Sequence, residues 1–193
     1  MTLVLASRSA SRQAMLRHAG VPFEARPAHV DERAVEADLG GARPDQVALA
    51  LAEAKALAVD GGDAPVLASD SLVVLGDRRF DKPESREQAA EHLREFSGRV
   101  MQLQSAAAIA VSGEIAWRHV GMASLQVREL SDEFIESYLD AEWPEVGHCV
   151  GVFRMEGMGV QLFERIEGDY FTVLGMPLVP VLGALREMGV LQS

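Results

Sequence analysis

The chain has 193 residues, 48% of them hydrophobic, and its mean hydropathy of +0.06 is typical of a globular protein. Its formal charge of −11 disfavours a general nucleic-acid-binding surface, although a small polyanionic substrate needs only local positive charge. The single cysteine, Cys149, excludes an internal disulfide and favours a reducing compartment. No apolar run approaches the ~18 residues that a membrane span needs, so we expect a cytoplasmic protein that binds neither membrane nor nucleic acid.

The N-terminal stretch predicts a strand, a turn and a helix. Residues 3–6 are apolar and too few for anything but a buried strand, and residues 13–20 contain helix formers before a terminating glycine. Ser9 or Ser11 can cap the helix, which would leave backbone N–H groups facing an anion, with the charge of Arg12 nearby. The pattern fits a phosphate site, and it fits equally a plain helix cap beside a solvated arginine.

Two adjacent carboxylates, Asp31 and Glu32, follow a short extended segment at residues 21–27. Carboxylate oxygens are typical ligands of a divalent cation. An acidic helix start would explain the same two residues, because negative charge is favourable at a helix N-terminus.

Residues 44–60 predict an amphipathic helix that begins at a proline. Lys55 lies at the margin of its apolar face, where most lysines extend their ammonium group into solvent. The residues expected on that face are Val47, Leu51, Ala54 and Ala58.

A long apolar strand is predicted at residues 66–75, and a polar triplet, Ser69-Asp70-Ser71, interrupts it. An unpaired ionised carboxylate buried there would cost several kcal/mol, so Asp70 should meet a metal, a cation or a cleft. Asp70 is therefore the strongest catalytic candidate on chemical grounds alone. The alternative is a bulge or bend that exposes the triplet to water.

The rest of the chain predicts further strands and helices. Early strands and helices alternate and a long hairpin follows, which indicates an α/β fold with a mixed, elongated central sheet flanked by helices. The expected elements are a short strand at 78–80, a helix at 85–96, hairpin strands at 100–111 and 115–127, a helix beginning at 131 and a final helix at 177–188.

Several motifs are shared with one known family. The first predicted strand ends in Leu-Ala-Ser-x-Ser with Arg12 in the first helical turn, and residues 51–56 read Leu-Ala-x-x-Lys-Ala. Lys82 precedes a proline beyond Asp70, and residues 156–168 read Glu-Gly-x-Gly-x-x-Leu-Phe-Glu-Arg-x-Glu-Gly. Together with Val-Asp-Glu before the second helix, these motifs resemble the Maf family of nucleoside triphosphate pyrophosphatases over essentially the whole chain.

The resemblance implies a single Maf-like domain over residues 1–193, with two lobes, a cleft between them and usually a homodimer. The implied reaction splits a nucleoside triphosphate into a monophosphate and pyrophosphate with a divalent cation, Mg²⁺ or Mn²⁺. Asp70 would be the general base, and Glu32 and Asp70 would hold the metal. The residues that would bind the phosphates are Ser7, Ser9, Arg12, Lys55 and Lys82.

Three positions are predicted to select the base: Ser11, Ser71 and Glu156. The family's usual Ser-Pro-Arg-Arg reads Ser-Ala-Ser-Arg at residues 9–12, and members that hydrolyse dTTP and UTP have Gln where Glu156 stands. This looks like the branch that prefers 7-methyl-GTP, because a carboxylate accepts hydrogen bonds from the N1–H and 2-amino groups of a guanine edge. The alternatives are a dTTP or UTP pyrophosphatase of the same family and a nucleotide-binding, division-inhibiting regulator with little turnover.

Overall fold

The structure, a computed structural model, describes residues 2–192. It divides into two compact units. Unit 1 comprises residues 2–71, 104–121 and 169–192, and unit 2 comprises Leu72–Leu103 and Met122–Gly168. Among the described residues, no helix combines the length and apolarity needed to cross a membrane.

The strands form a mixed seven-stranded sheet in the order β2-β1-β3-β5-β6-β7, with β4 paired to β3, which confirms the predicted α/β fold. The strands are β1 (Leu3–Leu5), β2 (Phe23–Ala25), β3 (Val66–Leu75), β4 (Arg78–Phe80), β5 (Val100–Val111), β6 (Glu114–Val127) and β7 (Phe163–Glu167). The α-helices are α1 (Ala10–His18), α2 (Glu32–Asp38), α3 (Pro44–Leu57), α4 (Arg86–Phe96), α5 (Asp132–Glu142), α6 (Tyr170–Val173) and α7 (Leu178–Glu187). Two 3₁₀ helices are η1 (Glu145–His148) and η2 (Met158–Leu162).

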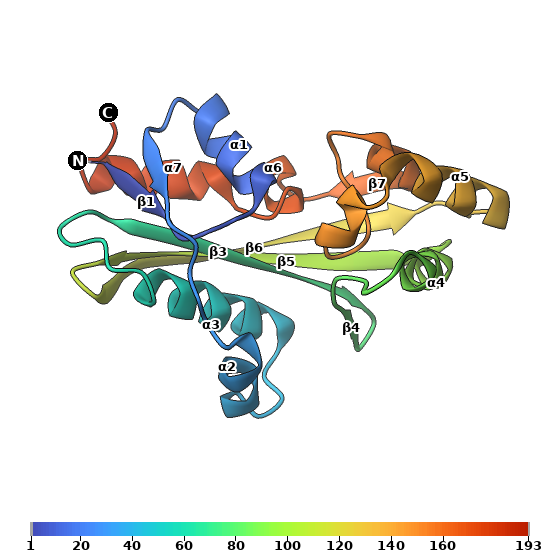
Figure 1. Cartoon of the computed structure of the whole chain (residues 1–193), viewed down its shortest axis with the longest axis horizontal. Helices are drawn as coiled ribbons and strands as arrows, with labels where there is room; N and C mark the ends of the chain where they lie inside the picture. The colour runs from blue at the N-terminus through green and yellow to red at the C-terminus, as the bar shows by residue number, and fades with distance from the viewer. Residues whose placement is uncertain (1, 193) are drawn as a thin grey trace. The chain divides into compact units, whose positions relative to one another are not determined.

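In unit 1, helices cover both faces of the sheet: α1 and α7 lie on one face and α3 lies on the other (Figure 1). The strand β1 pairs in parallel with β2 and with β3, and all three of its residues are buried. A strand covered on both faces has no solvent side, which explains why this segment is apolar throughout. Leu3 and Leu5 pack with Met15 and Leu16 of α1, and Trp117 packs at the edge of the same cluster.

The strand β1 is short, and its end leaves part of β3 without that neighbour. Its register with β3 stops at Leu5 opposite Leu67, and the last backbone bond there runs from Ala6 N–H to the Leu67 carbonyl at 2.8 Å. The polar triplet of β3 begins two residues later, beyond the carboxyl end of β1. In open α/β sheets, ligands bind outside the carboxyl ends of parallel strands.

The predicted helix at 44–60 is α3, but its expected apolar face is only partly right. Ala54 is half-buried and Ala58 is exposed, whereas small side chains form the buried face and allow a close approach to the sheet. The buried residues are Ala48, Leu51, Ala52 and Ala56. Lys55 is followed by Ala56, which is buried on this face. The side chain of Lys55 therefore begins close to the sheet.

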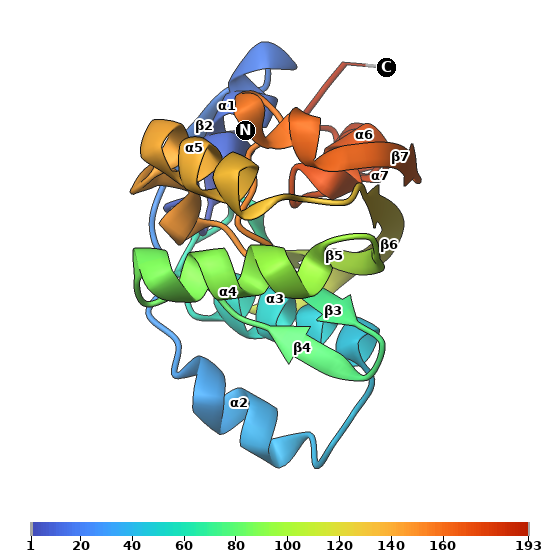
Figure 2. The same cartoon turned by 90° about the vertical axis from the view of Figure 1, so that its right-hand side faces the viewer.

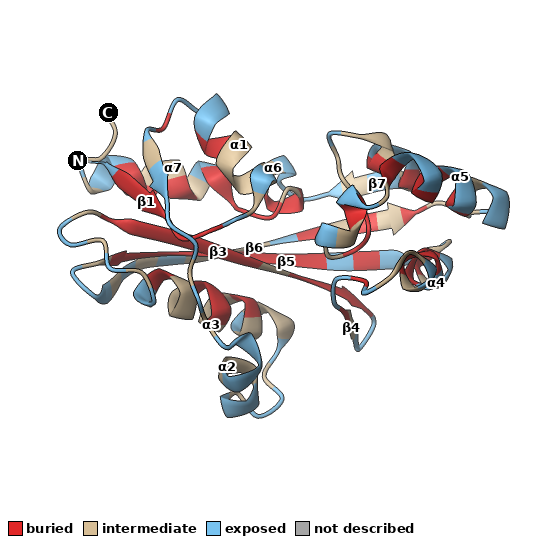
Figure 3. Ribbon diagram, viewed as in Figure 1, coloured by how far each residue is buried: buried red, intermediate tan, exposed pale blue. Residues whose placement is uncertain are grey.

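In unit 2, α4 and α5 contact each other (Figure 2). Each has a serine cap: Ser85 Oγ accepts from Gln88 N–H at 3.2 Å, and Ser131 Oγ accepts from Phe134 N–H at 3.2 Å. The long hairpin of β5 and β6 is also confirmed. Three short elements were not predicted, namely α6, η1 and η2. The helix α2, whose start was expected only as an alternative explanation of Asp31 and Glu32, contains no buried residue (Figure 3).

Candidate functional site

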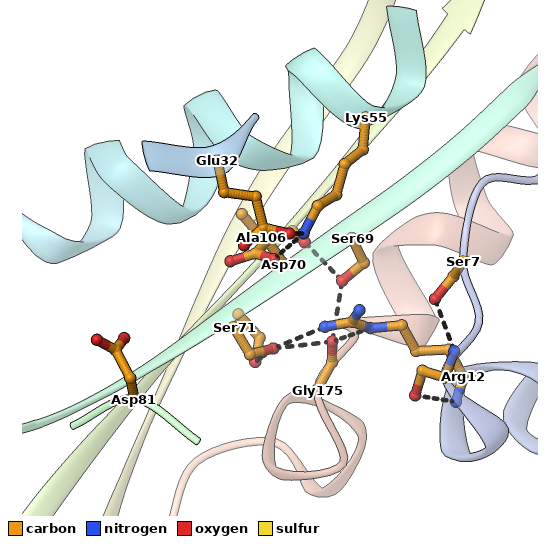
Figure 4. A network of polar contacts seen from close by, with 12 residues as sticks. Ser7, Arg12, Glu32, Lys55, Ser69, Asp70, Ser71, Asp81, Ala106 and Gly175 are labelled. Atoms are coloured by element: carbon orange, nitrogen blue, oxygen red, sulfur yellow. Dashed lines mark hydrogen bonds and ion pairs between the residues drawn. The ribbon is translucent and has the colours of Figure 1, made fainter. Parts of the chain in front are cut away.

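The ammonium group of Lys55 lies between two carboxylates of unit 1. Its Nζ is 2.5 Å from Asp70 Oδ1 and 2.8 Å from Glu32 Oε1 (Figure 4). The side chains of Lys55 and Asp70 are 16% and 11% exposed, whereas that of Glu32 is 50% exposed. A cluster built from three elements, α2, α3 and β3, therefore has a shielded ion pair and one carboxylate that faces solvent.

The surroundings of Asp70 show how a carboxylate is accommodated inside an apolar strand. The strand β3 runs from Val66 to Leu75, and Ser69 and Asp70 are only 1% and 8% exposed, so the predicted alternative of a triplet exposed to water is wrong. Asp70 stays within the strand, buried, and meets a cation. The alternative for Lys55, a side chain that extends into solvent, is wrong for the same reason, since a buried carboxylate needs a partner of opposite charge.

The two adjacent carboxylates at the start of α2 have different roles: one caps the helix and the other contacts the site. Asp31 is the helix cap, and its Oδ1 accepts from Ala34 N–H at 3.1 Å. Glu32 is the first residue of α2 and turns toward Lys55. Within residues 2–192, no group of three or more His, Cys, Asp or Glu side chains is placed to hold a metal ion by itself.

Arg12, in the first turn of α1, is fixed at two points of unit 1. Its Nε donates to the Gly175 carbonyl at 3.0 Å, and its Nη2 donates to Ser71 Oγ at 3.2 Å. Burial lowers the pKa of the Arg12 guanidinium from its ordinary value, and the charges of Asp70 and Glu32 partly oppose this effect. Arg12 is therefore an oriented cation in the same electrostatic field as the carboxylates, and the alternative of a solvated arginine is wrong.

The serines before α1 bond to their own backbone. Ser9 caps the helix, as predicted, because its Oγ accepts from Arg12 N–H at 3.3 Å. Ser7 Oγ accepts from Ser9 N–H at 3.1 Å. These two N–H groups have acceptors in the chain, and the expectation that the capped turn presents backbone N–H groups to an anion stays a prediction. Phosphate binding by Ser7 and Ser9 stays a prediction.

Three serine hydroxyls of the sheet hold the connection between α6 and α7. Ser69 Oγ lies 2.6 Å from the Ala106 carbonyl and 2.9 Å from the Gly175 carbonyl, and Ser71 Oγ lies 3.0 Å from the latter. Ser105 Oγ donates to the Thr172 carbonyl at 2.8 Å and lies 2.9 Å from Ser71 Oγ. The same connection receives a bond from Ser11 Oγ to the Leu174 carbonyl at 3.3 Å. The surroundings of Arg12 are thus set by contacts across the sheet.

Sequence reasoning missed Ser69, Ser105 and Gly175 as parts of this arrangement. One signal was present, because successive side chains of a strand point to opposite faces. Asp70 therefore leaves β3 on the side of α3, and its two serine neighbours leave on the side of Arg12 (Figure 4). Ser105 has no comparable local signal, since its partners come from distant parts of the chain.

Gly175 is required by its backbone conformation and by its neighbours. Its φ is +99°, and an added Cβ would lie 3.2 Å from Ser71 Oγ. We expect Gly175→Ala to lower the free energy of unfolding by about 1–3 kcal/mol in urea denaturation. Gly183 is the matched control, because it lies inside α7 with open space around its Cβ, and Gly183→Ala should raise stability by about 0.5–1 kcal/mol. Equal stability of the two variants would contradict the argument.

Lys82 and Glu156 belong to unit 2, where both side chains are exposed. Their predicted roles stay predictions. In the same unit, burial raises the pKa of the Cys149 thiol; Arg154 and Lys82 oppose this effect, and Glu156 adds to it. A protonated, half-buried thiol is a poor nucleophile, which disfavours a catalytic role for Cys149.

Comparison with known proteins identifies relatives along nearly the whole chain. The family described as Maf-like protein matches residues 2–188. A 7-methyl-GTP pyrophosphatase of Rhizobium meliloti (strain 1021) is 50% identical over 195 residues, covering 99% of this chain and 98% of the relative. A nucleoside triphosphate pyrophosphatase of Sphingopyxis alaskensis is 46% identical over 194 residues, covering 98% of each. Among solved structures, a HAM1 protein from Coxiella burnetii is 17% identical with a TM-score of 0.42, over 66% of this chain and 73% of that one.

Proposed function

The chain belongs to the Maf-like protein family, and from this premise we propose that it hydrolyses a nucleoside triphosphate to the monophosphate and pyrophosphate. The observation that carries the proposal is the shielded pair of Lys55 and Asp70, beyond the carboxyl end of β1. An ion pair buried in this way is a weak source of stability, because desolvation of the two charges offsets most of their attraction. Its placement beyond the carboxyl end of β1 is better explained by a catalytic role.

Asp70 is the proposed general base. A water molecule attacks the α-phosphorus, its proton passes to the Asp70 carboxylate, and the bond from the α-phosphorus to the bridging oxygen breaks as pyrophosphate leaves. Lys55 holds Asp70 Oδ1 at 2.5 Å and so restricts how this carboxylate can turn. The relatives named as pyrophosphatases support this reaction class.

The residues of the cluster fit a divalent cation that arrives with the substrate. Mg²⁺ is usually bound by one or two carboxylates together with substrate phosphates and waters, and Glu32 and Asp70 both reach the same ammonium group. These two carboxylates would hold Mg²⁺ or Mn²⁺, which would supply charge neutralisation at the phosphates. Arg12 and Lys55 then provide fixed positive charge for the triphosphate, since phosphoryl transfer depends mainly on positioning and charge stabilisation. Ser7, Ser9 and Lys82 are included in the proposal as phosphate-binding residues.

For the base, we take 7-methyl-GTP as the proposed substrate, with Glu156 as its principal reader and Ser11 and Ser71 as further selecting residues. Relatives that carry this substrate in their names support the choice, at 50% and 48% identity. The contacts of Ser71 with Arg12 and Gly175 give it a second task, because it also orients the guanidinium group. One functional domain, a homodimer and a cytoplasmic location remain parts of the proposal.

The test is pyrophosphate release from 7-methyl-GTP, GTP, UTP, dTTP and CTP, each with Mg²⁺ and with Mn²⁺. We expect the highest kcat/KM for 7-methyl-GTP, and we expect Glu156→Gln to shift the ratio of kcat/KM for 7-methyl-GTP over UTP toward UTP. A preference of the wild type for UTP or dTTP would keep the reaction and discard the proposed base. Tight nucleotide binding without any product would favour the regulator instead.

A further inference from the structure

One helix of unit 2 holds both ends of the segment that carries Glu156. This segment, residues 152–158, is called the base loop below. Tyr138 and Glu142 lie one turn apart on α5 and so share a face of the helix. Tyr138 Oη donates to the Val152 carbonyl at 2.9 Å, and Glu142 Oε1 accepts from Met158 N–H at 2.8 Å. Glu156 lies between these two anchor points.

At the first anchor, the bond from Tyr138 meets an unusual backbone. Val152 has φ +57°, a left-handed conformation that is rare for a β-branched residue, and it is fully buried. Such a conformation persists only where the surroundings determine it. Tyr138 is also fully buried, and burial raises the pKa of its hydroxyl, so it remains a hydrogen-bond donor across the ordinary pH range. The strained end of the base loop is therefore tied to a permanent donor.

At the second anchor, the base loop lies directly against the Glu142 carboxylate. Gly157 has an extended backbone, with φ −124°, that any residue can adopt, so conformation does not require glycine there. An added Cβ would lie 2.5 Å from Glu142 Oε1, so a larger residue at this position would displace the carboxylate. The Glu142 side chain is only 10% exposed, and its Oε2 lies 3.7 Å from Arg154 Nη1. One carboxylate thus contacts the loop before and after Glu156.

We propose that Tyr138 and Glu142 are positioning residues that fix the base loop for recognition of a purine edge by Glu156. The inference rests on the proposed function, because it presumes that Glu156 reads the base. Neither residue needs to touch the substrate. A carboxylate discriminates between base edges only when it is held in one place, since a mobile one can meet several donor patterns.

The readout is the ratio of kcat/KM for 7-methyl-GTP over UTP. Both substrates are assayed on the same preparation, so any loss of folded protein cancels in the ratio. We expect Glu142→Ala to lower the ratio about tenfold through KM for 7-methyl-GTP, as for a lost hydrogen bond to a charged group. Glu142→Gln keeps an acceptor for Met158 N–H and should recover most of the ratio. Glu133→Ala, at an exposed position of the same helix, should leave it unchanged.

Two more variants test the same two anchor points with different substitutions. Gly157→Ala should displace the Glu142 carboxylate and reproduce the effect of Glu142→Ala without a change in α5. Tyr138→Phe removes only the hydroxyl group and should lower the ratio by a smaller factor, about threefold. Hydrogen exchange of the base-loop amides should be faster in Glu142→Ala than in Glu133→Ala.

The outcomes separate the inference from the function on which it rests. If Glu156→Gln shifts the ratio but Glu142→Ala and Gly157→Ala leave it unchanged, the inference is overturned and the proposed function stands. If Glu156→Gln has no effect, the inference also fails, because the loop then holds no reader. If the wild type releases no pyrophosphate, the proposed function fails by itself, and unchanged amide exchange in Glu142→Ala would separately overturn the anchoring.

Discussion

Asp70→Asn should lower kcat for nucleoside triphosphate hydrolysis by at least about 100-fold while the chain remains folded, because an amide cannot accept the proton of the attacking water. The substitution keeps the volume of the side chain, and Lys55 retains Glu32 at 2.8 Å as a partner of opposite charge. Pyrophosphate release at saturating 7-methyl-GTP measures the loss, and circular dichroism confirms the fold.

The matched control is Asp77→Asn in the exposed turn that follows β3, which should leave kcat unchanged. A rise in KM with little change in kcat would show that Asp70 acts mainly in binding the substrate. Near-normal turnover of Asp70→Asn would remove Asp70 from the role of general base, whichever nucleobase the substrate carries.

Lys55→Met should give the largest loss of stability. The substitution leaves the Asp70 carboxylate buried without its cation, and breaking a buried pair in this way costs about 3–5 kcal/mol. The side-chain exposures of 16% for Lys55 and 11% for Asp70 show that little of the pair is in contact with water. Urea denaturation measures the free energy of unfolding, and activity should fall as well, because a phosphate-binding charge is lost.

The double variant Lys55→Met with Asp70→Asn isolates the cause of this loss. If an uncompensated carboxylate explains it, the second substitution should restore much of the stability, so that the two effects are not additive. Lys82, the other lysine of the chain, is exposed, and Lys82→Met should change the free energy of unfolding by less than about 0.5 kcal/mol. Additive effects of the two buried substitutions would contradict the pairing.

The interpretation of Asp70 shows how far elementary chemistry can go from sequence. A carboxylate inside an apolar strand has few affordable environments, so its need for a cation was predictable. The identity of that cation was less accessible, because between Val47 and Val59 only Glu53 and Lys55 are polar. The spacing of apolar residues cannot identify the buried face of a helix that is apolar almost all around. The predicted apolar face of α3 therefore differs from the buried face of the structure.

The fold class was predictable because the strand and helix periods are clear in the longer elements. The helix α2 was not, since it buries no residue and therefore has no apolar period to detect. The contacts of Ser105 and Gly175 were not predictable either, because they join residues that are 67 and 104 positions apart, where only the folded chain defines the partners. The different roles of Asp31, a helix cap, and Glu32, a site residue, were unpredictable for the same reason.

The absence of any buried residue in α2 distinguishes the two carboxylates around Lys55. Asp70 belongs to a strand in the core of unit 1, so displacing it would require opening the sheet. Glu32 belongs to a helix whose departure would expose little apolar surface, and such elements open locally at low free-energy cost. The cluster therefore combines a carboxylate that is fixed in the sheet with one on a helix that can open locally at low free-energy cost.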